Sequence, residues 1–201
     1  MRRYLLFGLL ALLIATVVAS LFMTNCMSER RRVRAASLAT SGMPLPEYDS
    51  SGALIRPKDF ENWMFVGSNI GMSYSTEESK GPGEFHNVYT QREAYAEYVK
   101  TGKFPEKTMF VLAEYAPQQK VSINKNGYFE GYLSGMAASV KNHERFPEGW
   151  AYYAFDSVAA GAKAKASLKP MCFECHDQHA DDDHVFVQFH AVLRQAWKTK
   201  R

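Results

Sequence analysis

Cysteine is scarce in this 201-residue sequence, and its three copies are unevenly placed. Cys26 lies in a hydrophobic leader, whereas Cys172 and Cys175 lie together near the C-terminus. A structural zinc site would need a second pair of ligands, and the distant Cys26 cannot complete one. A redox dithiol usually follows a strand in a thioredoxin-like unit, and no such unit is indicated before Cys172. The distribution of cysteine therefore argues against both kinds of site.

Charge is absent from residues 4–28, and residues 4–23 form a nearly continuous apolar run preceded by Arg2 and Arg3. This pattern predicts an N-terminal hydrophobic helix over residues 1–28, outside the globular fold. The run is about long enough to span a bilayer as a membrane anchor. Val18-Ala19-Ser20 is also a candidate cleavage site for a signal peptide. The sequence leaves both alternatives open.

Basic residues outnumber acidic ones only in the N-terminal part of the chain, residues 1–34. Six arginines and one glutamate lie within residues 1–34, so the remaining residues carry 18 basic and 20 acidic side chains. We therefore predict no nucleic-acid partner for the folded domain. Residues 29–54 read as a basic flank and flexible linker, because their second half is rich in Ser, Ala, Pro and Gly. We expect a single folded domain over residues 55–201.

The segment Met171-Cys172-Phe173-Glu174-Cys175-His176 matches a c-type haem attachment site. If this turn is helical, Cys172 and Cys175 lie on one face, where their sulfurs can bond covalently to one porphyrin. His176 lies on the same side and can bind the iron as its axial ligand. The sequence therefore predicts one covalent haem c.

The domain is predicted to have an α+β fold, with an antiparallel sheet and flanking helices. Runs rich in β-branched and aromatic residues predict strands at 64–68, 85–89, 108–115, 128–140 and 150–155. Helical spacing predicts helices at 91–101 and 184–197, with Asp183 as a candidate cap of the second. The apolar stripe of the second helix could pack on the porphyrin or on the sheet.

Methionine is absent from the 25 residues that follow His176. Small electron-carrying c cytochromes usually have an early haem motif and a downstream methionine ligand, so this architecture is disfavoured. A motif near the C-terminus is typical of the four-helix cytochromes c′, but the strand-rich centre argues against a helix bundle.

The sequence resembles the cytochrome P460 family, which includes the β-sheet cytochromes c′. The resemblance rests on the order and spacing of several short segments: Trp63 with Val66-Gly67, Asn87-Val88-Tyr89, Tyr98 with Thr101-Gly102-Lys103-Phe104-Pro105, Asn126-Gly127-Tyr128-Phe129, Ala138-Ser139-Val140-Lys141, the haem motif, and Val185-Phe186 with Leu193-Arg194. It implies an antiparallel sheet carrying a c-type haem, commonly in a homodimer. It also implies that His176 is the proximal ligand and that the distal face of the haem is open.

The resemblance also bears on the chemistry of the distal side. Members that oxidise hydroxylamine carry a lysine bonded to the porphyrin and a glutamate thought to accept a proton; the matching positions here are Leu112 and Ala137. Neither side chain can act as a base. We therefore expect an apolar distal pocket formed by Phe85, Leu112 and Ala137, which binds NO or CO without catalysis.

Alternatives to this interpretation remain. The protein could be an enzyme that oxidises hydroxylamine or NO despite the missing lysine, and a substitute cross-link from Lys107 is a separate possibility. It could also be a six-coordinate electron carrier that uses His86 or a methionine. Met109 and Met136 are expected in the core. His190 stands where the family commonly has tyrosine, which could alter hydrogen bonding on the proximal side. Because haem c is attached outside the bacterial cytoplasm, we expect a periplasmic protein, secreted or anchored in the membrane, that exchanges electrons with a redox partner.

Overall fold

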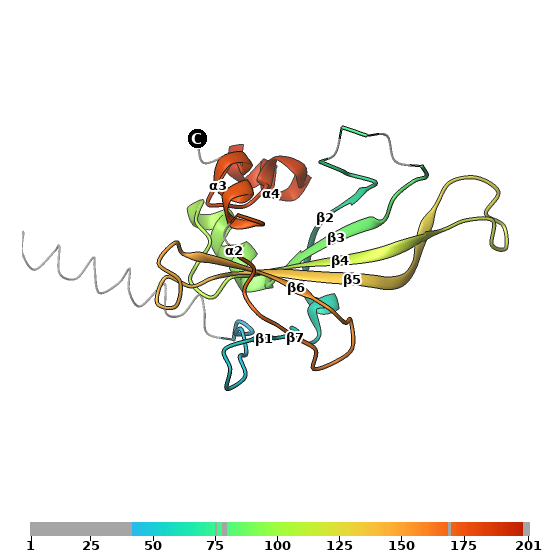
Figure 1. The fold of residues 1–201 in the computed structure, drawn as a ribbon. Helices are drawn as coiled ribbons and strands as arrows, with labels where there is room; N and C mark the ends of the chain where they lie inside the picture. Colours follow the sequence, from blue (N-terminus) through green and yellow to red (C-terminus); the bar gives the residue numbers. More distant parts are fainter. Residues whose placement is uncertain (1–41, 75, 78–79, 169, 199–201) are drawn as a thin grey trace, which may run out of the picture. The chain divides into compact units, whose positions relative to one another are not determined.

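A five-stranded antiparallel sheet forms the centre of the structure (Figure 1). This computed structural model describes residues 42–74, 76–77, 80–168 and 170–198. The strand order follows the sequence: β2 (Met64–Ile70), β3 (Phe85–Thr90), β4 (Met109–Gln118), β5 (Phe129–Lys141) and β6 (Trp150–Phe155). The predicted α+β fold with an antiparallel sheet is confirmed. All five strand segments predicted from the sequence are present, and most extend beyond their predicted ends.

Both faces of the sheet are covered, because alternate residues of each strand point to opposite sides. On one face, Met109, Val111 and Ala113 of β4 pack in a cluster with Phe60 and Tyr153. This cluster also contains Met136, so the expected core positions of Met109 and Met136 are confirmed. On the other face lies a second cluster, to which three helices contribute. Figure 1 shows α2, α3 and α4 together on that side.

A small two-stranded sheet lies outside the main one and was not predicted. It pairs β1 (Leu54–Ile55) with β7 (Lys163–Ala164), and the 3₁₀ helix η1 (Phe60–Asn62) follows β1. Met43 and Leu54 are buried, and Tyr48 bridges to Leu54. The compact unit accordingly begins at residue 42. Residues 42–54 therefore belong to the folded domain, which corrects the linker that composition alone predicted there.

The helix α2 (Arg92–Thr101) agrees with the sequence prediction. Tyr98 faces the core, where its ring stacks on Phe104 at a centroid distance of 4.0 Å. Gly102 ends the helix in the left-handed region, with φ of 74°, and its backbone N–H donates to the Tyr98 carbonyl oxygen. This end is a common helix stop, because glycine adopts a positive φ without a steric cost.

The C-terminal segment differs from the single helix predicted over 184–197. It forms a 3₁₀ turn, η2 (Val187–Phe189), followed by α4 (Ala191–Lys198). His190 is extended and separates the two. Leu193 of α4 is fully buried in the second cluster, on the face of the sheet that the helices cover. Asp183 caps neither element, since its carboxylate binds Lys141 instead.

The predicted N-terminal hydrophobic helix, residues 1–28, and the basic flank up to residue 41 lie outside the described residues. Among the residues that are described, no helix has the length and hydrophobicity needed to cross a membrane.

Candidate functional site

The Cys-x-x-Cys-His motif lies at the start of a short helix, α3 (Phe173–His179). Cys172 is the N-cap residue, and the backbone N–H of His176 donates to the Cys172 carbonyl oxygen at 3.0 Å. This hydrogen bond closes one helical turn, so Cys175 and His176 follow Cys172 on the same helix face. Both cysteines are free and half-buried. The structure thus brings together the three residues that the sequence predicts to hold the haem.

The ring of His176 is fixed by a hydrogen bond to the next loop. Its Nδ1 lies 2.8 Å from the carbonyl oxygen of His184. Since a carbonyl oxygen only accepts, Nδ1 carries the proton and Nε2 keeps its lone pair. Burial lowers the pKa of His176, which favours the neutral ring. The rings of Tyr152 and Phe186 pack against it at centroid distances of 4.3 and 4.5 Å. His176 is therefore held as a neutral imidazole, the form that binds a metal ion.

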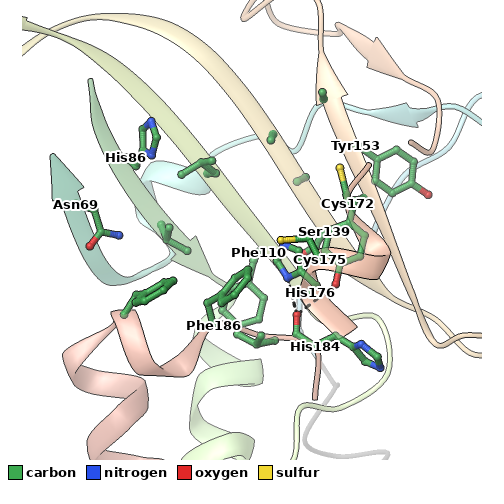
Figure 2. A pocket seen from close by; sticks show the side chains of 18 of the residues that line it. Asn69, His86, Phe110, Ser139, Tyr153, Cys172, Cys175, His176, His184 and Phe186 are labelled. Carbon is green, nitrogen blue, oxygen red and sulfur yellow. Dashed lines mark hydrogen bonds between the residues drawn. The ribbon is translucent and has the colours of Figure 1, made fainter. Parts of the chain in front are cut away.

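Cys172, Cys175 and His176 line a cavity of about 460 Å³ between α3, the C-terminal segment and the sheet (Figure 2). Cofactor and ligand pockets usually measure roughly 300–1,000 Å³. The donor set fits a c-type haem, because two thiols are available for the porphyrin and one neutral imidazole for the iron. Within the described part of the chain, no three His, Cys, Asp or Glu side chains converge as a metal-ion site of their own.

A row of apolar side chains crosses the sheet on the cavity side. Leu112 of β4 pairs with Val88 on β3 and with Ala137 on β5, and Ala137 pairs with Ala154 on β6. All four residues line the cavity. Leu112 and Ala137, which are 25 residues apart in the sequence, are therefore direct neighbours in one wall. The alkyl side chains of this wall offer no hydrogen bond to a ligand.

Phe85 does not line the cavity, in contrast to the sequence expectation. It is paired with Tyr115, whereas His86 is paired with Glu114 and does line the cavity. The reason is the alternation of side chains along a strand, which turns residues 85 and 86 to opposite faces of the sheet. His86, which the sequence analysis kept as a possible sixth ligand of the iron, thus lies beside Val88 on the cavity side of β3.

A second, polar row lies next to the apolar one. Asn69 pairs with His86, and His86 pairs with Glu114; all three line the cavity. Figure 2 shows Asn69 and His86 side by side on their strands. Gly135, opposite Glu114 on β5, leaves room for the carboxylate, because a Cβ at residue 135 would collide with Glu114 Oε2. The sequence analysis did not identify Glu114. It could have done so, because residues two apart on a strand point to the same face, and Leu112 was already expected to line the pocket.

His190 contributes a buried imidazole to the same cavity. Its side chain is 7% exposed, and its Nδ1 has no hydrogen-bond partner among the described residues. Burial, with a smaller contribution from Arg194, lowers the pKa of His190 to about 4. Gly67 provides the space for this ring, since a Cβ there would lie 2.9 Å from His190 Nδ1. His190 is therefore an uncharged part of the wall.

Other residues raised by the sequence lie elsewhere. Lys107 is not a lining residue; its Nζ donates to Asn142 and forms an ion pair of 2.6 Å with Glu144. Met109 and Met136 belong to the core on the opposite face of the sheet. Met72 and Met171 do line the cavity, although the sequence analysis, which left a methionine ligand open, named neither.

The chain matches the model of a known protein family. The family model described as Cytochrome P460 matches residues 57–187, which include the main sheet, α2 and α3. No match was found among curated proteins.

Proposed function

Because the chain belongs to the cytochrome P460 family and is thus a c-type haem cytochrome, we propose that it carries one haem bonded to Cys172 and Cys175. His176 Nε2 would be the axial ligand of the iron. The observation that carries this proposal is the His176–His184 hydrogen bond, which leaves Nε2 unprotonated beside two free thiols. When bound, the iron supplies a coordination position for small diatomic molecules such as NO and CO.

The residues of the cavity support binding of an uncharged ligand. Val88, Leu112, Ala137 and Ala154 form an apolar wall that offers no hydrogen bonds and would disfavour a charged or strongly hydrated molecule. The loss of a hydration shell costs little for NO or CO. The proposed activity is therefore reversible gas binding rather than oxygen activation.

Absorption spectroscopy of the purified ferric and ferrous protein, with and without NO, tests this function. We expect a high-spin ferric spectrum that becomes low-spin only when a ligand is added, and a haem that stays on the polypeptide under denaturing conditions. A low-spin spectrum without added ligand would contradict the open position and indicate His86 or Met72 as a sixth ligand. The Cys172→Ala/Cys175→Ala variant is the control for covalent attachment.

One observation favours a second candidate function, the oxidation of hydroxylamine. Glu114 and His86 are ionisable groups on the wall of the same cavity, so a proton acceptor is available although residue 137 is alanine. Steady-state assays with hydroxylamine and an artificial electron acceptor distinguish the two functions. Robust nitrite or N₂O formation that Glu114→Gln abolishes, and that Glu84→Gln outside the cavity does not, would replace gas binding with catalysis.

We further propose that the mature protein acts in the periplasm as a homodimer and exchanges electrons with a redox partner there. The family, whose members carry c-type haem, supports this location. Light scattering of the purified protein measures the oligomeric state, and cell fractionation with N-terminal sequencing determines whether the leader is removed or retained as an anchor.

A further inference from the structure

The loop that orients His176 has an unusual backbone. Asp183 and His184 both have positive φ angles, 47° and 58°. Left-handed backbone is uncommon for residues with a side chain, and two in succession require support from their surroundings. This conformation presents the His184 carbonyl oxygen to His176 Nδ1 at 2.8 Å. The loop therefore has to be held in place for the hydrogen bond to persist.

The support comes from two side chains at the ends of paired strands. Lys141 ends β5, Trp150 begins β6, and the two residues are register partners. Lys141 Nζ lies 2.6 Å from Asp183 Oδ2, and Trp150 Nε1 donates to Asp183 Oδ1 at 3.1 Å. Lys141 also donates to the Phe104 carbonyl oxygen at 2.9 Å. We call the Lys141–Asp183 ion pair, with its Trp150 hydrogen bond, the loop clamp.

The His184 carbonyl oxygen receives a second hydrogen bond. Tyr152 donates its hydroxyl to this oxygen at 3.2 Å, while its ring packs on His176. Two donors therefore share one acceptor, and the Tyr152 bond withdraws electron density that the oxygen would otherwise offer to His176. The loop clamp and Tyr152 act on the same bond in opposite directions.

We infer that Lys141 and Asp183 are positioning residues that set the electron-donating strength of His176 through the His184 carbonyl. This inference depends on the proposed function, in which His176 binds the iron. A hydrogen bond from Nδ1–H to an acceptor makes the ring more basic and strengthens its bond to the metal. A stronger donor favours the ferric state. Loss of the loop clamp therefore raises the reduction potential, and loss of the Tyr152 hydroxyl lowers it.

The first test is the double variant Lys141→Met/Asp183→Asn, which removes one positive and one negative charge together and so leaves the net charge unchanged. Asparagine tolerates the left-handed backbone at residue 183. We expect a lower iron–histidine stretching frequency in the ferrous resonance Raman spectrum. We also expect about a tenfold shift toward the ferrous form at a fixed potential, equal to about 59 mV for one electron.

The matched control is Lys107→Met/Glu144→Gln. It removes an ion pair with the same 2.6 Å separation from a site that does not line the cavity. Its stretching frequency and potential should equal those of the wild type. If this control shifts both quantities as much as the Lys141→Met/Asp183→Asn variant does, the effect is nonspecific and the inference is wrong.

The second variant, Tyr152→Phe, keeps the ring on His176 and needs no change in the loop clamp, so it tests the inference even if the double variant fails to fold. We expect the opposite result, a stretching frequency above and a reduction potential below those of the wild type. A lower stretching frequency with a higher potential, or no shift from the wild type in either quantity, refutes the inference. A wild-type protein without covalent haem instead refutes the proposed function, which separates the two outcomes.

Discussion

The loop clamp should also make a measurable contribution to stability. Lys141 is the test residue, since its side chain is only 11% exposed and its Nζ binds both Asp183 and the Phe104 carbonyl oxygen. Removing one partner of a buried ion pair typically costs about 3–5 kcal/mol, because the other charge is left unpaired. Asp183 is 27% exposed and keeps its bond from Trp150, so this range has to be reduced.

For Lys141→Met we therefore expect the free energy of unfolding to fall by about 2–3 kcal/mol. Asp183→Asn can still accept from Lys141 and should cost about 1 kcal/mol. The double variant has no unpaired charge and should cost less than the sum of the two, with a coupling of at least about 1 kcal/mol. At a domain of this size, the Lys141→Met change corresponds to a fall in Tm of roughly 4–12 °C.

Urea unfolding followed by far-ultraviolet circular dichroism measures all four proteins of this cycle, since the haem does not dominate that signal. The same cycle at Lys107 and Glu144 is the control, and its coupling should be small because Glu144 is 84% exposed. If the costs at Lys141 and Asp183 simply add, the two residues do not support each other, and the account of the loop given above fails.

Three further predictions concern the walls of the cavity and the core beside it. Because burial lowers the pKa of His190 to about 4, below that of an unfolded histidine, the folded state disfavours its protonation. The free energy of unfolding should therefore have its full value above about pH 6.5 and fall by about 3 kcal/mol as the pH drops to 4. Denaturant titrations of the wild type and of His190→Gln should show this loss only in the wild type. Leu193→Ala leaves a cavity at a fully buried position and should lower the free energy of unfolding by about 2–5 kcal/mol in the same assay. The dependence of that free energy on denaturant concentration should not change. Gly135→Ala should displace the Glu114 carboxylate and change the stretching frequency of bound CO, whereas a spectrum identical to the wild type would show that Glu114 does not approach the ligand.

Much of the fold follows from local patterns. The strands are recognisable because aromatic and β-branched residues recur along them, and α2 because Tyr98 lies on its apolar side and Gly102 provides a stop. The haem motif is recognisable because its chemistry fixes the spacing of Cys172, Cys175 and His176.

What the sequence could not provide depends on contacts between distant segments. The burial of Leu54 involves pairing with Ala164 of β7, more than a hundred residues later. The buried position of the His190 ring, at the break of the last helix, depends on the space left by Gly67 of β2. The role of Asp183 depends on Lys141 and Trp150, which only the register of β5 and β6 brings to it.

The alternation along β4 gives neighbouring residues two different roles. Met109, Val111 and Ala113 hold the domain together on one side, while Leu112 and Glu114 between and beyond them meet the ligand space on the other. Mutations at the second set can therefore change what the protein binds or transforms while the first set preserves the fold. On such a strand, the ligand-facing side can be redesigned separately from the side that stabilises the fold.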